Sequence, residues 1–229
     1  MRATRALAVA ALVALDVGAA AAQSTRHFTD SWFWGVKGGI LSYQVQSAID
    51  PPSNNAGNTW ALMAGGDWLI TRTKAGLYLS FDHSFFSQDS VFVNDSVTPL
   101  DTVPRSVHLS GMRRFTLAGM VFPLNSQRYH PYLGIGGTLS SIAEVEPQGG
   151  FSSTTQQNLV LNTVTQFKTV ASPVIILGFQ MRLVAFSIFG QATATPANNN
   201  FFLWTQNGWR TTGEAGIRYN IGSSIDRMR

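Results

Sequence analysis

Apolar residues alternate with polar or small residues along eight separate segments of the chain. In the first segment one face consists of Trp32, Trp34, Val36, Gly38 and Ile40. The opposite face consists of Gly35, Lys37 and Gly39. A period of two is typical of a β-strand, because successive side chains point to opposite faces of a sheet. We expect the first face to meet lipid and the second to line a crowded interior.

The same alternation predicts eight strands, at residues 32–45, 59–70, 75–86, 107–122, 132–143, 174–182, 185–195 and 209–221. Four long polar connections are expected at 47–58, 88–104, 146–165 and 196–208. Three short turns are expected at 71–74, 123–130 and 183–184. Pro173 would stand at the start of the sixth strand, where a missing N–H is tolerated.

Long and short connections therefore alternate strictly along the chain. A soluble β-sandwich, which is the alternative fold, has no reason to gather every long loop at one end. Outer-membrane barrels combine short periplasmic turns with longer extracellular loops, and their tilted strands cross the bilayer with about 9 to 11 residues. Lipid offers no partner to backbone N–H and C=O groups, so such a sheet closes on itself. We predict an all-β fold, an eight-stranded antiparallel up-and-down transmembrane β-barrel over residues 31–221.

Composition and the N-terminal residues agree with export to the cell outer membrane. Only 12% of residues are charged, against about 25% in soluble domains. Arg2 and Arg5 precede an apolar run and a string of alanines that ends at Ala22, so residues 1–22 are expected to be a signal peptide. Residues 23–30 and 222–229 would form a periplasmic lead and tail. Aromatic girdles are expected at the two rims: Trp32, Trp34 and Tyr219 on the periplasmic side, with Trp60 and Trp209 on the other.

Charge and residue types exclude several classes of function. Residues 1–22 hold two arginines and one aspartate, so without them the 16 basic and 12 acidic residues fall to 14 and 11. Such a weak bias predicts no nucleic-acid partner. The chain has no cysteine, and His27, His83, His108 and His130 lack the spacing of metal ligands. We expect neither a metal nor a cofactor.

The C-terminal segment Glu214-Ala-Gly216-Ile-Arg-Tyr219-Asn-Ile221 resembles the signal by which outer-membrane barrels are recognised for assembly. With the segment Pro131-Tyr-Leu-Gly-Ile-Gly-Gly137, it resembles the OmpA/OmpX-type superfamily of small barrels. The motif departs from the usual form because it ends in Ile221 rather than Phe and because residues 222–229 follow it. The resemblance implies an assembly signal at Glu214, Gly216, Tyr219 and Ile221. It also implies a monomer whose partners are the barrel-assembly machinery, outer-membrane lipid and lipopolysaccharide.

One short motif suggests catalysis. His108-Leu109-Ser110 resembles the His-x-Ser arrangement of outer-membrane lipid A deacylases, in which a Glu on the adjoining strand is the third member. Alternation places His108 and Ser110 inward, away from a lipid substrate, and the nearest downstream acid, Glu144, falls by the far rim. We therefore expect no catalytic site and no enzyme.

Seven charged residues take the inward face when each strand is read with a period of two: Lys37, Asp67, Asp82, Arg114, Arg182, Glu214 and Arg218. An eight-stranded barrel leaves little interior space, so these charges are expected to pair in a polar network that closes the lumen. The alternative is that some of them lie in water at the rims. Strict alternation would send Arg113 into lipid at a cost of about 2–4 kcal/mol, so the pair Arg113-Arg114 predicts a β-bulge.

The expected role is that of a structural or surface-interaction barrel, because the loops hold the variable polar residues. A narrow channel for small or hydrophobic solutes is the alternative, and a lipid-modifying enzyme comes third.

Overall fold

The computed structural model describes residues 28–43, 59–94, 101–124, 126, 128–148, 153–183, 185–196 and 209–223. The predicted signal peptide lies outside the described residues. So do most of the lead, the loop at 47–58, nearly all of the loop at 196–208, and residues 224–229.

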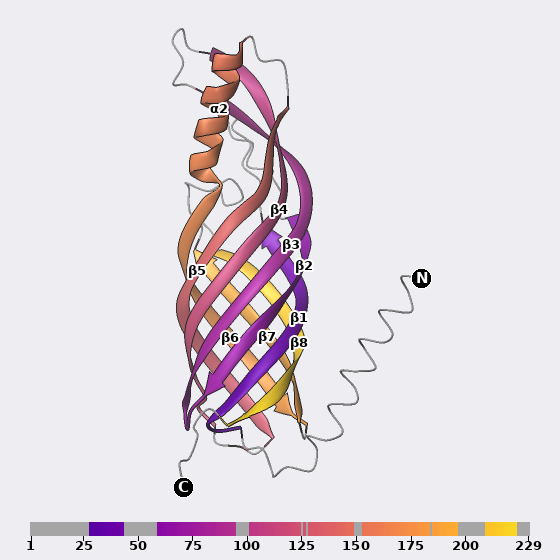
Figure 1. Cartoon of the computed structure of the whole chain (residues 1–229), viewed down its shortest axis with the longest axis vertical. Coiled ribbons are helices and arrows are strands. Elements are labelled where there is room, and N and C mark those ends of the chain that lie inside the picture. Colours follow the sequence, from indigo (N-terminus) through magenta and orange to yellow (C-terminus); the bar gives the residue numbers. More distant parts are fainter. Residues whose placement is uncertain are drawn as a thin grey trace, which may run out of the picture.

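Eight antiparallel strands form a closed barrel (Figure 1). They are β1 (Ser31–Tyr43), β2 (Thr59–Thr71), β3 (Ala75–Asn94), β4 (Asp101–Val121), β5 (Tyr129–Gln148), β6 (Thr169–Arg182), β7 (Phe186–Pro196) and β8 (Trp209–Ser223). Each strand pairs with the next along the chain, and β1 pairs with β8 to close the sheet. The predicted fold class is confirmed.

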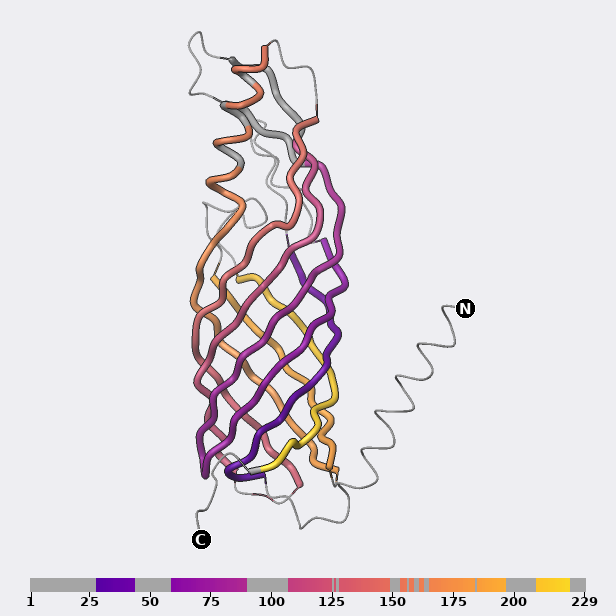
Figure 2. The backbone as a smooth tube through the Cα atoms, in the orientation of Figure 1, coloured from indigo at the N-terminus to yellow at the C-terminus, as the bar shows by residue number. Residues whose placement is uncertain are grey.

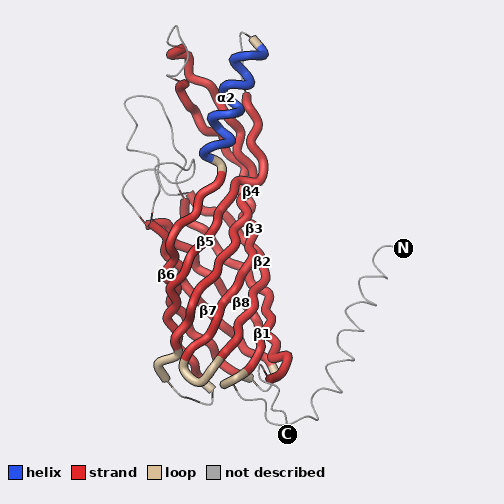
Figure 3. The backbone as a smooth tube through the Cα atoms, turned by 60° about the vertical axis from the view of Figure 1, so that its left-hand side comes forward, coloured by secondary structure: helices blue, strands red, loops and turns tan. Residues whose placement is uncertain are grey.

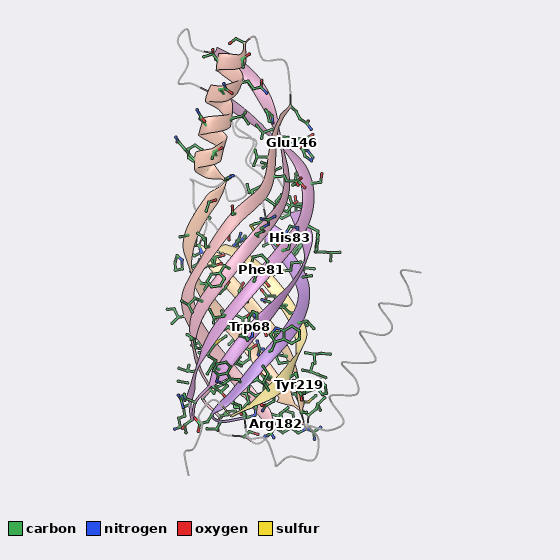
Figure 4. The ribbon with its side chains drawn as sticks, in the orientation of Figure 1. Trp68, Phe81, His83, Glu146, Arg182 and Tyr219 are labelled. Atoms are coloured by element: carbon green, nitrogen blue, oxygen red, sulfur yellow. The ribbon has the colours of Figure 1, made fainter. Side chains whose placement is uncertain are left out.

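The two faces of the wall follow the alternation. Apolar side chains cover the outside, and they include Ile135, Leu177 and Leu62, which are 71%, 64% and 68% exposed. The four predicted girdle tryptophans are also exposed. Trp68 and Phe81 lie on this outer wall, whereas Tyr219 and Arg182 lie near one end of the barrel (Figure 4). Tyr219 is half-buried and packs against Phe186 with ring centroids 5.2 Å apart.

Strands β3, β4 and β5 continue beyond the barrel and form an extension with the helix α2 (Thr154–Phe167) (Figures 2 and 3). The predicted loop at 88–104 is wrong, because β3 reaches Asn94 and β4 begins at Asp101. The predicted loop at 146–165 is also wrong, because β5 reaches Gln148 and the helix follows. At the base of the extension, Val107 and Leu109 are fully buried in a cluster with Leu41 and Tyr43. No helix among the described residues is long and apolar enough to cross a membrane.

Two strand boundaries also differ from the prediction. β6 begins at Thr169, so Pro173 lies within the strand and pairs with Gly137 of β5. The described pairing of β6 with β7 begins only at Ile175. Pro173 therefore behaves like a residue on an edge strand, where the missing N–H breaks no ladder. β5 begins at Tyr129, which places His130 inside the barrel rather than in a turn.

A β-bulge interrupts the pairing of β3 with β4. Phe85 and Phe86 lie opposite the single residue Gly111, whose φ is 62°. Glycine adopts this left-handed conformation at no steric cost. At Gly111 the alternation of buried and exposed residues along β4 shifts by one position. The bulge expected at Arg113-Arg114 is wrong, because both residues pair in regular register with β3 and Arg113 lies on the outer face; the bulge lies opposite Gly111 instead. Before Gly111 the predicted faces are reversed, since Val107 and Leu109 point inward and His108 points outward.

Candidate functional site

Four buried charged side chains meet in the middle of the lumen. Nζ of Lys37 lies 2.6 Å from Oε2 of Glu214 and 2.8 Å from Oδ1 of Asp82. Nη2 of Arg114 lies 2.9 Å from Oδ2 of Asp82 and also contacts Glu214. Two cations and two anions therefore alternate around one centre, which we name the central cluster.

Neutral side chains add hydrogen bonds to the central cluster. Glu214 accepts hydrogen bonds from Gln191 at 2.8 Å and from Thr212 at 2.9 Å. Lys37 donates to the hydroxyl of Tyr78 at 3.0 Å. Buried charges are tolerated only where pairing and hydrogen bonds replace water, and this cluster provides both.

A second ion pair lies beside the central cluster. Arg218 donates to Asp67 from Nη2 at 2.8 Å and from Nε at 3.1 Å, and donates from Nη1 to Gln180 at 2.7 Å. Its guanidinium also lies 3.7 Å from the centre of the Phe189 ring. Both Arg218 and Asp67 are fully buried. A fork of donors on a carboxylate, with a ring beneath it, is the geometry that favours arginine over lysine.

Glycines make both pairings possible. Gly35 on β1 is the register partner of both Asp67 on β2 and Arg218 on β8, so these two side chains meet across it. A Cβ at Gly35 would lie 2.5 Å from Oδ1 of Asp67 and 2.7 Å from Cγ of Arg218. Gly65 lies between Lys37 and Asp82 in the same way. Because the middle strand has no side chain at these positions, charged residues on the two strands that flank it can form an ion pair.

Tyr78 joins the central cluster to the second ion pair. Its hydroxyl accepts hydrogen bonds from Lys37 and from Gln191, the latter at 2.9 Å. The guanidinium of Arg218 lies 5.7 Å from the centre of its ring. Tyr132 donates to Gln191 at 2.9 Å and extends the chain of contacts. The central cluster, the pair Arg218–Asp67 and the side chains that join them form one structure, which we name the polar plug. It contains three cations and three anions, so their formal charges sum to zero.

Apolar residues pack on both sides of this polar plug. On the side of the extension they are Leu41, Tyr43, Ala61, Met63, Val107, Leu109, Met112, Ile142 and Val170. At the opposite end Phe28 stacks on His130 with ring centroids 3.6 Å apart and meets Phe122 edge-on at 4.9 Å. Phe28, near the end of the predicted periplasmic lead, is therefore buried in the apolar packing at this end of the barrel, which alternation within the strands could not reveal.

Six of the seven charges predicted for the interior meet in the plug, and Arg182 does not. Arg182 is the last residue of β6 and is half-buried, with its backbone N–H bonded to the carbonyl of Arg128. It has the inward parity of Gln180 but lies at the rim, where its charge reaches water. Sequence reasoning missed Tyr78, Gln180 and Gln191, which take inward positions but carry no charge. It also missed Arg210, which is buried and whose Nη2 lies 3.4 Å from Oγ1 of Thr195.

The residues of the expected assembly signal lie on β8. Glu214 belongs to the central cluster, Gly216 faces the lumen, and Ile221 is exposed on the outer wall. Their part in assembly stays a prediction. The described residues contain no group of three or more His, Asp or Glu side chains that could hold a metal ion.

No family model matches the chain, and no curated protein matches its sequence. Several solved structures resemble it. Neisserial surface protein A is 8% identical, with a TM-score of 0.48 over 82% of this chain and 97% of that one. OprG from Pseudomonas aeruginosa is 11% identical, with a TM-score of 0.44 over 88% and 100%. Ail of Yersinia pestis is 9% identical, with a TM-score of 0.42 over 83% and 99%. The class of protein, a closed eight-stranded antiparallel barrel, rests on this chain's own strand order.

Proposed function

We propose that this chain is an outer-membrane protein whose closed barrel is an anchor for an extracellular surface that interacts with other molecules. The observation that carries the proposal is the polar plug, in which six buried charges balance one another across the lumen. A lumen filled in this way supports an anchor and argues against a channel.

The outer wall supports the membrane setting. Its exposed apolar side chains would be unfavourable in water over so large an area, and a closed barrel leaves no strand edge unpaired in lipid. The short connection 72–74 lies at one end, and the extension of β3, β4, β5 and α2 rises at the other. This asymmetry matches short periplasmic turns and longer extracellular elements.

Cysteine labelling on intact cells tests the proposed orientation, and the natural absence of cysteine makes each introduced thiol unique. We expect Asn55→Cys, Asn94→Cys, Gln156→Cys and Asn199→Cys to react with a membrane-impermeant maleimide. Lys74→Cys is expected to react only after the outer membrane is permeabilised. The opposite result would invert the orientation, and recovery in the soluble periplasmic fraction would overturn the membrane setting.

A further inference from the structure

Three polar side chains form a hydrogen-bonded row on the outer wall of the extension. Oγ of Ser87 lies 3.0 Å from Nε2 of His108, and Nδ1 of His108 lies 2.6 Å from Oδ1 of Asp89. Ser87 and Asp89 are exposed, and His108 is partly exposed. One ring nitrogen therefore faces a hydroxyl while the other faces a carboxylate, which is the arrangement that activates a serine nucleophile.

The local backbone explains why these residues meet. Ser87 and Asp89 are two positions apart on β3, so their side chains point the same way. Asp89 is the register partner of His108 on β4, and the bulge at Gly111 turns His108 to the outside. Without the bulge, His108 would point into the lumen. The row therefore depends on a feature that alternation along β4 cannot reveal.

We propose that Ser87, His108 and Asp89 are a serine hydrolase site that cleaves a carboxylic ester of an outer-leaflet lipid. Oγ of Ser87 would attack the ester carbonyl carbon while Nε2 of His108 takes the hydroxyl proton. The ester C–O bond then breaks, and His108 gives that proton to the departing alcohol. Water attacks the acyl-serine, passes a proton through His108, and releases the fatty acid with Ser87 restored.

The acid and the bulge both position the imidazole for this chemistry. Asp89 holds the imidazole in one orientation and stabilises the imidazolium that forms, as the acid of such a triad does. The bulge interrupts the β3–β4 ladder immediately before Ser87. The bulge also sets the outward direction of His108 that brings its ring to Ser87.

The position of Ser87 points to a lipid. Phe85, which is 57% exposed, lies two residues below it on the same face and is the register partner of the exposed Leu62. Ser87 therefore stands roughly 7 Å above Phe85 and Leu62, in the rim zone where the girdle residue Trp60 is also exposed. The acyl esters of membrane lipids lie at this boundary between hydrocarbon and headgroups. This choice of substrate rests on the membrane setting proposed above.

The charges near the site limit which lipid headgroup can bind there. Glu146 is the register partner of His108 on β5, and Glu144 lies on the same exposed face. Figure 4 shows Glu146 on the extension, above His83. Two acids beside the histidine disfavour an anionic headgroup, so a zwitterionic phospholipid is the probe that fits the site.

The test uses the full-length protein reconstituted in dioleoylphosphatidylcholine vesicles, with mass spectrometry of released oleate and lysolipid. We expect hydrolysis by the wild type, loss of hydrolysis in Ser87→Ala and His108→Ala, and a fall of about 10²- to 10⁴-fold in Asp89→Asn. Ser141→Ala, which changes another outward serine, serves as the matched control and should retain the wild-type rate. A fluorophosphonate probe should add one group to Ser87, and Ser87→Ala should remove that adduct.

Several results would overturn the proposal. Hydrolysis that survives in Ser87→Ala but is lost in Ser110→Ala would move the nucleophile to the His108-x-Ser110 motif. The proposal is also refuted if the wild-type protein releases no oleate or lysolipid, or if the fluorophosphonate probe labels a residue other than Ser87. Heat-modified migration on gels checks that each variant is folded. Fractionation with the outer membrane is measured separately, so failure of hydrolysis and failure of the membrane setting can be told apart.

Discussion

Replacing Glu214 by Gln should strongly destabilise the barrel. Glu214 meets Lys37 at 2.6 Å and also contacts Arg114, and both cations are buried. Glutamine keeps the shape but removes the charge, so two buried cations are left with the single carboxylate of Asp82. Breaking a buried ion pair on one side costs about 3–5 kcal/mol, because the remaining charge stays unbalanced. We expect the free energy of unfolding of Glu214→Gln to fall by that amount.

A second change should restore part of this loss. Lys37→Met alone leaves two carboxylates with one cation and should cost a similar amount. The double variant Lys37→Met/Glu214→Gln keeps the neutral pair of Arg114 and Asp82, which are 2.9 Å apart. Its cost should therefore be smaller than the sum of the single costs by about 1–3 kcal/mol.

Equilibrium unfolding in urea measures these costs, with the barrel in lipid vesicles and tryptophan fluorescence as the signal. Glu144→Gln makes the same chemical change on the outer face and should stay within about 0.5 kcal/mol of the wild type. Purely additive single and double costs would refute the reasoning that charge balance holds the plug together. A Glu214→Gln variant as stable as the control would refute it more simply.

Two further predictions follow from the second ion pair, and the same unfolding assay checks both. Arg218→Lys should lower the stability by about 1.5–3 kcal/mol, since a single ammonium cannot reproduce the forked contact with Asp67; a cost near zero would contradict the described geometry. Gly35→Ala should cost about 1–3 kcal/mol because its Cβ would press on Asp67 and Arg218. The matched control is Gly38→Ala on the outer wall, where a Cβ meets nothing closer than 3.6 Å; equal costs in the two variants would contradict the steric argument.

The alternation of the strands was enough to predict the barrel and most of its interior charges. Lys37, Asp82 and Glu214 could be assigned to the lumen because a period of two fixes the face on which each side chain lies. Pairings between strands that are not neighbours, such as Asp67 on β2 with Arg218 on β8, could not be predicted. They depend on how far two side chains reach across a glycine.

The extension could not be predicted from the sequence pattern. The predicted loop at 146–165 contains most of α2, whose sequence is rich in Thr, Gln and Asn and shows no clear apolar face. One glycine with positive φ, Gly111, reversed the faces of β4 before it. The motif at His108 was therefore assigned to the wrong side of the wall, and its partners Ser87 and Asp89 lay in or beside a predicted loop. In this region local backbone geometry, rather than composition, determines on which face of the wall each side chain lies.

Conductance in a planar lipid bilayer tests most directly whether the polar plug closes the lumen. Purified wild-type protein is expected to give no steady channels, because three buried ion pairs and the apolar packing on both sides leave ions no hydrated path. Glu214→Ala removes the acid that contacts both Lys37 and Arg114, so this variant is expected to leak. Steady, reproducible channels from the folded wild type would contradict a closed lumen.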